Sequence, residues 1–239
     1  ENALDAVTSG TDNTAVGDNA LGANTTANAN TAVGSGALLV NTTGATNVAI
    51  GLNALAANTT ANSNTAVGGY ALDANTTGAT NTAVGEESLS ANTTGSNNVA
   101  MGYKALLTNA TGASNTAVGT EALEKNTTDS NTAFGYQAAE ETTTGDFNVA
   151  VGASAFEDNT TGAQNTAIGG YALRNNTTAN NNVAVGYIAM DANTTGASNV
   201  AVGAYALDAN TTGTYNVGIG YEALSASTTT SQNTGVGYR

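Results

Sequence analysis

The stretch NTAVGGYALDANTTGAT, residues 64–80, is followed at once by NTAVGEESLSANTTGSN, residues 81–97. Both stretches begin with Asn-Thr-Ala-Val-Gly and carry Ala-Asn-Thr-Thr-Gly near their ends. A unit that recurs at a fixed spacing predicts a repeat architecture, in which each unit packs on its neighbours.

The seventeen-residue unit accounts for the whole chain, and we number its positions 1 to 17. One unit, at 115, has sixteen residues and lacks a residue in its last turn. The chain begins and ends inside partial units, which predicts a segment of a longer array. We therefore predict a single repeat array over residues 1–239, with units that start at 13, 30, 47, 64, 81, 98, 115, 131, 148, 165, 182, 199, 216 and 233.

The unit favours β-structure over helix. Gly and the Asn-Thr-Thr segment interrupt every unit and disfavour a helix. Positions 2 to 4 read Thr or Val, then Ala, then a branched apolar residue, which predicts a strand with positions 2 and 4 on one face. We predict an all-β fold, a β-solenoid (parallel β-roll or β-helix) of fourteen repeats, with two or three short strands per coil, assembled as an oligomeric fibre.

Several positions of the unit are expected to be structural. Asn at position 1 and Gly at position 5 occur in all fourteen copies, which predicts an asparagine ladder and a glycine in a positive-φ or close-packed turn. Inside the fourteen units, charges occur only at positions 6, 7, 10, 11, 15 and 16, so these are predicted to be solvated corners. In the quoted unit the structural positions are Asn64, Ala66, Val67, Gly68, Ala71, Leu72, Asn75, Thr76 and Thr77.

The predicted core is thin, with one Leu, one Val or Ile and two Ala per coil. Ordering a coil costs about 1–2 kcal/mol of backbone entropy per residue, so further chains are expected to contribute. The small Ala at position 3 would let another layer approach closely. The sequence thus predicts a homo-oligomer, and a trimer is favoured.

The composition excludes several classes of function. The net charge is −14, which disfavours nucleic acid as a partner, and no apolar run is long enough for membrane insertion. The chain has no His or Cys, so neither a Ser-His-Asp nor a Cys-His arrangement exists. We predict no catalytic, cofactor-binding or metal site and no enzyme activity; a calcium ion between occasional corner acids is a less favoured alternative.

The tyrosines are the candidate contact residues of the surface. They recur at positions 6 and 7, where exposed rings could stack on sugars or anchor a partner. The alternative is that they only cover the glycine corner and pack between subunits. The candidates are Tyr70, Tyr103, Tyr136, Tyr171, Tyr187, Tyr205 and Tyr221, with Tyr238 at the same place in the last unit.

The Asn-Thr-Thr segment matches the N-glycosylation sequon, as at Asn24, Asn58, Asn75 and Asn193. Its regular placement predicts a structural role instead.

The pattern N-[TV]-A-[VI]-G-x-x-A-L-x-x-N-T-T-G resembles the repeats of bacterial and phage tail-fibre-domain proteins. It is also similar to the head repeats of YadA-like trimeric autotransporter adhesins, whose repeats are shorter and lack the Asn-Thr-Thr corner. Asn64, Ala66, Gly68, Ala71 and Leu72 carry the match, together with Asn75-Thr76-Thr77. The resemblance implies a trimeric, extracellular, β-rich fibre used in attachment.

We therefore expect a non-catalytic structural segment of an extracellular fibre or adhesin, on a bacterial surface appendage or a phage virion, with a cell-surface target or glycan as a possible partner. The alternative is a monomeric solenoid that binds glycan or ice through its repeated Thr/Asn face. Adjacent strand residues face opposite ways, so Thr-Thr gives one outward row of threonines instead of two, which disfavours ice. A solenoid lyase or hydrolase is disfavoured, because no irregular charged cleft is predicted.

Overall fold

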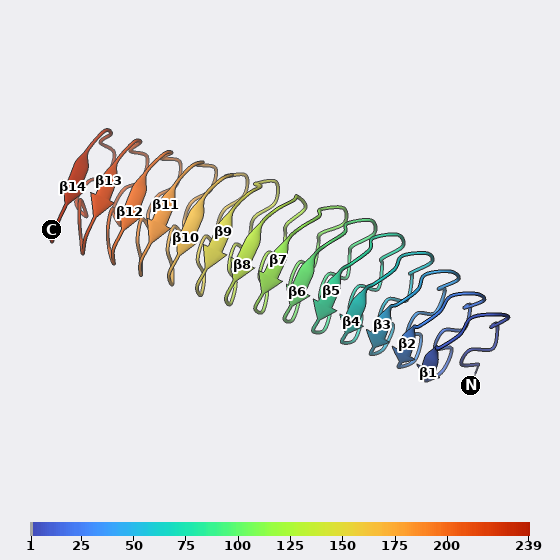
Figure 1. The fold of residues 1–239 in the computed structure, drawn as a ribbon. Helices are drawn as coiled ribbons and strands as arrows, with labels where there is room; N and C mark the ends of the chain where they lie inside the picture. Colours follow the sequence, from blue (N-terminus) through green and yellow to red (C-terminus); the bar gives the residue numbers. More distant parts are fainter. Residues whose placement is uncertain (1) are drawn as a thin grey trace. The chain divides into compact units, whose positions relative to one another are not determined.

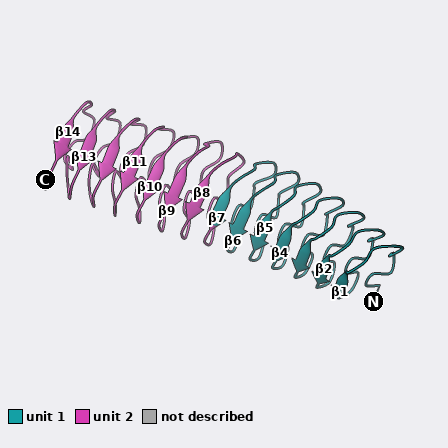
Figure 2. Ribbon diagram, in the orientation of Figure 1, with its two compact units in different colours: residues 1–117 teal, residues 118–239 magenta. Residues whose placement is uncertain are grey.

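The computed structural model describes residues 2–239, and these contain strands and turns but no helix. The chain divides into two compact units, residues 1–117 and 118–239 (Figure 2). Within each unit, every strand pairs in parallel with the strands before and after it in the chain (Figure 1). The predicted all-β solenoid is confirmed.

The strands are three residues long and cover positions 2 to 4 of each repeat. Those of the first unit are β1 (Thr14–Val16), β2 (Thr31–Val33), β3 (Val48–Ile50), β4 (Thr65–Val67), β5 (Thr82–Val84) and β6 (Val99–Met101). The boundary between the two units falls in β7 (Thr116–Val118), the strand of the shortened repeat. Those of the second unit are β8 (Thr132–Phe134), β9 (Val149–Val151), β10 (Thr166–Ile168), β11 (Val183–Val185), β12 (Val200–Val202), β13 (Val217–Ile219) and β14 (Thr234–Val236).

The strand register places like positions side by side. In the β4–β5 pair, Thr65 aligns with Thr82, and Ala66 with Ala83. The same alignment holds in the second unit, as in β11 and β12, where Val183 aligns with Val200 and Ala184 with Ala201. Each position of the repeat therefore forms a row along its unit.

The rest of each coil also bonds to its neighbours, although it is not extended strand. Backbone N–H groups donate to the next coil from Leu72 to Ser88, 3.0 Å, and from Thr76 to Thr93, 3.0 Å. The prediction of two or three strands per coil is wrong, because positions 7, 9 and 17 have positive φ and interrupt extended backbone.

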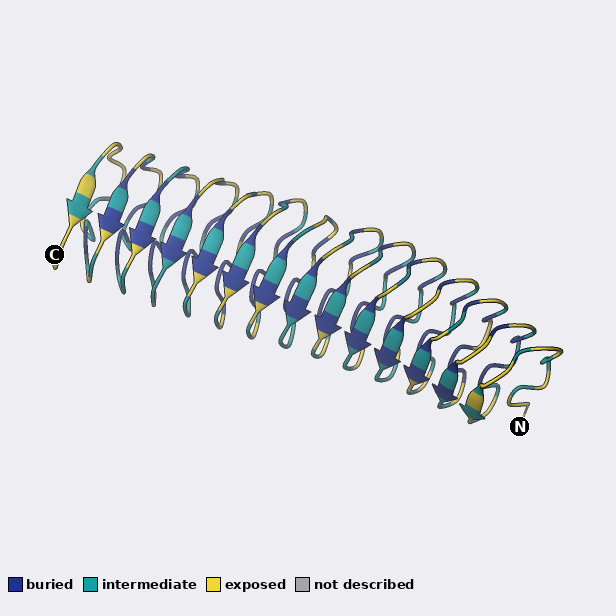
Figure 3. Ribbon diagram, in the orientation of Figure 1, coloured by how far each residue is buried: buried dark blue, intermediate teal, exposed yellow. Residues whose placement is uncertain are grey.

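The core consists of Ala at positions 3 and 8 and Leu at position 9, which are buried in most coils (Figure 3). The apolar residue at position 4 was expected in this core, and the structure places it on the opposite side of the strand. The interior has no room for it: a Cβ atom at Gly218, a position-3 residue, would lie 3.1 Å from Cγ of Leu207. Only Ala or Gly fits there.

Two rows of buried asparagine side chains run from coil to coil along the core, and we call them ladders. At position 1, the backbone N–H of Asn64 donates to Oδ1 of Asn47, 2.9 Å, which confirms the predicted ladder. At position 12, Nδ2 of Asn75 donates to Oδ1 of Asn58, 3.1 Å. Nδ2 of both Asn64 and Asn75 also donates to the carbonyl oxygen of Gly78, 3.0 Å in each case. The two asparagines of one coil are thus joined through the same carbonyl group, at position 15.

The glycine at position 5 meets both predicted requirements. Gly68 has φ of +141°, and a Cβ atom there would lie 2.4 Å from the carbonyl oxygen of Gly85 in the next coil. A side chain would need a strained backbone and would also collide with backbone atoms.

The shortened repeat lacks its position-14 residue. Nδ2 of Asn126 donates to the carbonyl oxygen of Thr128, 2.9 Å, where other repeats use the residue three places after the Asn. Thr128 thus occupies position 15, and the outward threonine is missing. The deletion removes an exposed residue and keeps the asparagine contact.

Candidate functional site

The outward side of the strands carries the side chains at positions 2 and 4, and we call it the outer face. Position 2 is Thr or Val, and position 4 is always apolar. Position 2 is half-buried in all strands except β1 and β14. Position 4 is more exposed, with 40% of Ile168 and 53% of Phe134 accessible. The exposed position-4 residues are Val16, Ile50 and Met101 in the first unit, and Phe134, Val151, Ile168, Val202, Ile219 and Val236 in the second.

An outer face of this kind is unusual for a chain that stays alone in water. Single exposed apolar residues are normal, but a contiguous apolar row marks an interaction surface. The interior beneath it is filled by Ala, Leu and Asn.

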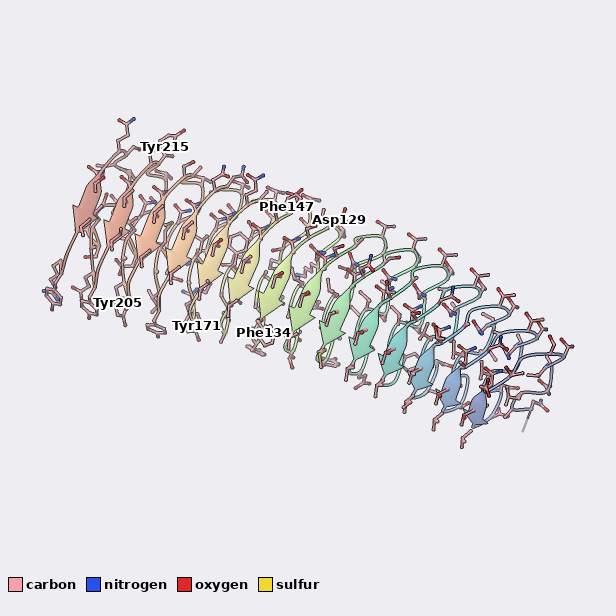
Figure 4. All side chains as sticks on the ribbon, viewed as in Figure 1. Asp129, Phe134, Phe147, Tyr171, Tyr205 and Tyr215 are labelled. Carbon is pink, nitrogen blue, oxygen red and sulfur yellow. The ribbon has the colours of Figure 1, made fainter. Side chains whose placement is uncertain are left out.

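The tyrosine candidates all lie at the surface, on the corner that follows each strand. Six are exposed, Tyr238 among them, and Tyr171 and Tyr205 are half-buried. Figure 4 shows Tyr171 and Tyr205 along the edge at which the strands end, whereas Phe147 and Tyr215 lie along the opposite edge. Tyr103 instead lies 5.1 Å, centroid to Nζ, from its neighbour Lys104. Within residues 2–239, no ring-to-ring contact brings Tyr70, Tyr103 and Tyr136 together.

Five tyrosines of the second unit form a continuous ladder on successive coils. Neighbouring ring centroids are 5.4 to 6.1 Å apart. Pairs that join position 6 to position 7 meet edge to face, whereas Tyr221 and Tyr238, both at position 6, are stacked with planes 12° apart. We call this set the tyrosine ladder; its members are Tyr171, Tyr187, Tyr205, Tyr221 and Tyr238.

A shallow cavity of about 240 Å³ opens in the middle of the ladder. Tyr205, Tyr221, Asp208, Glu222 and Ser225 line it. The hydroxyl of Tyr221 bonds to the carboxylate of Glu222, which raises the pKa of Tyr221. Burial raises the pKa of the Asp208 carboxyl, and hydrogen bonds from its own backbone N–H and from that of Ala209 oppose this increase.

Several charged side chains beside the tyrosine ladder form ion pairs. Glu222 forms an ion pair with Arg239, which lowers the pKa of Glu222. Arg174 pairs with Asp191 at 3.1 Å and lies 5.0 Å from the ring centroid of Tyr171. The corner therefore combines aromatic faces with hydrogen-bond acceptors.

The threonine row at position 14 is one residue wide, as the sequence indicated. Thr77 is exposed, whereas Thr76 is half-buried and donates from Oγ1 to the carbonyl oxygen of Thr93, 3.0 Å. The sequon asparagines Asn24, Asn58, Asn75 and Asn193 are completely buried in the position-12 ladder. In the folded chain their amides are structural and not open to modification.

One cluster of carboxylates stands out in the second unit. Ligand oxygens of Glu121, Glu124 and Glu140 lie within 4.8 Å of one another. Burial, and then the negative charges of Glu121 and Glu124, raise the pKa of Glu140 to about 7. The prediction that charges at position 10 lie in solvated corners is therefore wrong for Glu140, which is half-buried.

The sequence indicated the tyrosines but not their partners. Asp208 and Glu222 appeared only as corner charges, and the signal that could have found them is their spacing. Asp208 is at position 10 of one coil and Glu222 is at position 7 of the next, and both lie beside the tyrosines. The position-4 surface was missed because a larger apolar residue is ordinarily assigned to the core.

Comparison with models of known protein families, with curated proteins and with solved structures finds no match to this chain. Residues 2–239 contain no helix of the length and apolarity needed to cross a membrane.

Proposed function

We propose that the chain is a non-catalytic structural segment of an extracellular fibre or adhesin, on a bacterial surface appendage or a phage virion, and that it works in attachment. It self-associates through the outer face, and a trimer is favoured by the resemblance to trimeric fibre repeats. The observation that carries this proposal is the row of exposed position-4 residues along a regular sheet.

The burial pattern supports self-association. The coil already fills its interior with Ala, Leu and Asn, so the position-4 side chains are not needed for the core. Covering these apolar side chains with another surface would stabilise the assembly by about 25 cal/mol per Å² of apolar area buried. A second copy offers the same row at the same spacing, because the register aligns like positions along each unit.

Cross-linking at one position tests the proposal, since the chain has no native cysteine. Val202→Cys places a thiol on the outer face, and Thr195→Cys places one on the exposed threonine row. We expect a short bis-maleimide to link Val202→Cys chains in pairs and to leave Thr195→Cys chains unlinked. A trimer allows only about two thirds of the chains to pair, whereas a dimer allows all of them.

Equal cross-linking at both positions, or none at either, would contradict self-association through the outer face. Complete pairing at Val202→Cys would contradict the trimer and indicate a dimer.

A further inference from the structure

The tyrosine ladder is concentrated in one part of an otherwise uniform array. Positions 6 and 7 accept many residue types, including Asp-Asn at 18–19 and Leu-Asn at 52–53. A residue that only covered the glycine corner would be scattered along the chain, as Tyr70 and Tyr103 are. The five rings of the ladder instead occupy five coils in succession, from the unit at 165 to the unit at 233.

The cavity within the ladder offers two complementary kinds of contact. Tyr205 and Tyr221 supply aromatic surface, 5.9 Å apart between ring centroids. Asp208, Glu222 and Ser225 supply oxygen atoms to its lining. Carboxylate oxygens accept strong hydrogen bonds, so a ligand that brings hydroxyl donors to this lining gains affinity.

The charges around the cavity indicate which class of ligand it can bind. Asp208 and Glu222 line the cavity without a lysine or arginine among the lining residues, although Arg239 pairs with Glu222 from outside it. An anionic ligand would be repelled by these carboxylates. A neutral sugar matches the cavity, because its C–H face packs on a ring while its hydroxyls donate to carboxylates.

We propose that the tyrosine ladder binds neutral carbohydrate chains, with one sugar ring packed in the cavity against Tyr205 and Tyr221 and hydrogen-bonded to Asp208 and Glu222. The remaining rings of the ladder extend the contact to neighbouring sugars of the same chain. This inference rests on the proposed function, since it supplies the contact that attachment requires.

Binding is measured on the full chain by calorimetry with three neutral probes: chitohexaose, cellohexaose and maltohexaose. Because the chain has no Trp, its tyrosine fluorescence reports ligand contact independently. We expect at least one probe to bind, and we expect Tyr205→Ala and Tyr221→Ala each to weaken that binding about tenfold. Asp208→Ala should weaken it similarly, because the acceptor is lost.

Matched controls separate the ladder from tyrosine in general. Tyr70→Ala and Tyr103→Ala remove rings from the same corner positions without touching the ladder, and they should leave the affinity unchanged. Tyr221→Phe keeps the ring and should retain most of the binding. Circular dichroism of each variant establishes whether its fold is intact.

Absence of binding to all three probes at millimolar concentration would overturn the inference, and so would equal loss in the Tyr70→Ala control. Binding of hexalysine with no sugar binding would also overturn it and indicate an acidic docking site for protein. The oligomer mass is measured on the same samples. A trimer that binds no sugar contradicts only this inference, whereas a monomer that binds sugar contradicts only the self-association.

Discussion

Individual residues of the repeat are fixed by backbone geometry more than by side-chain chemistry. Leu72 at position 9 is fully buried with φ of +53°, a region that bulky residues avoid. The left-handed conformation costs about 1–2 kcal/mol, and burial of the leucine returns about 1.5–3 kcal/mol. Glycine at this position would remove the backbone strain, but it would leave a cavity in the core.

The adjacent glycines 68 and 69 allow a sharp test of the close-packed corner. Gly68→Ala should lower the free energy of unfolding by more than about 3 kcal/mol, because its Cβ would lie 2.4 Å from backbone and its φ is +141°. Gly69→Ala should be neutral or stabilise by about 0.4–1 kcal/mol, since no atom lies within 4 Å of its Cβ. Urea unfolding followed by circular dichroism compares the two, and equal effects would refute the account of this corner.

Asn75 tests the ladder at position 12. Asn75→Ala removes the donor to Gly78 and to Asn58, and it also removes the acceptor of Nδ2 of Asn92, 2.9 Å. Because these groups are buried, we expect a loss of about 1–3 kcal/mol or more for the groups left unpaired. Thr77→Ala, on the exposed threonine row, should change stability by less than about 0.5 kcal/mol. A neutral Asn75→Ala would show that the ladder does not stabilise the coil.

The single coil shows which local features could be predicted. The period, the strand at positions 2–4 and the ladder at position 1 follow from residue type and spacing alone. The direction of position 4 does not, because Ala and Val both suit a strand and only the narrow interior decides between them. The positive φ at Leu72 has no signal in the sequence, since leucine ordinarily avoids that conformation.

The acidic corner between coils should make stability depend on pH. The pKa of Glu140 is raised from 4.5 to about 7, so the folded state binds this proton more tightly than the unfolded state. The contribution of Glu140 is therefore most favourable below about pH 4.5, and it is lost as the pH rises through 7. We expect Glu140→Gln to raise the melting temperature by a few degrees at pH 8 and to leave it unchanged at pH 4.

Glu86→Gln is the matched control, because Glu86 is an exposed corner carboxylate in another repeat. It should leave the pH dependence of melting as in the unmodified chain. A Glu140→Gln variant with the same pH dependence as the unmodified chain would show that this carboxyl does not titrate in the expected range.

At the scale of the whole molecule, we propose different roles for the two kinds of surface on a chain of near-identical coils. The apolar position-4 side chains of the outer face recur in both units, which fits the proposed self-association. The tyrosine ladder is confined to part of the second unit, as a ligand site would be. The sequence alone predicted an oligomer and named the candidate tyrosines. The surface that we propose for association, and the grouping of five tyrosines into one ladder, became visible only in the folded chain.

Charge on the outer face should prevent association. The triple variant Ile168→Lys, Val202→Lys and Ile219→Lys places ammonium groups where another chain would pack, and each buried charge costs several kcal/mol. We expect a folded monomer by sedimentation velocity. The triple variant Thr161→Lys, Thr195→Lys and Thr212→Lys carries the same charge on the exposed threonine row and should associate as the unmodified chain does. Association of both variants would exclude the outer face as the interface.

The most direct test of the central proposal is the absolute mass of the unmodified chain, measured by light scattering across a range of concentrations. Self-association through the outer face as a trimer predicts a mass three times that of the 23.3 kDa chain. A mass of 23.3 kDa at every concentration would show that the apolar row stays in water, and it would contradict the proposal.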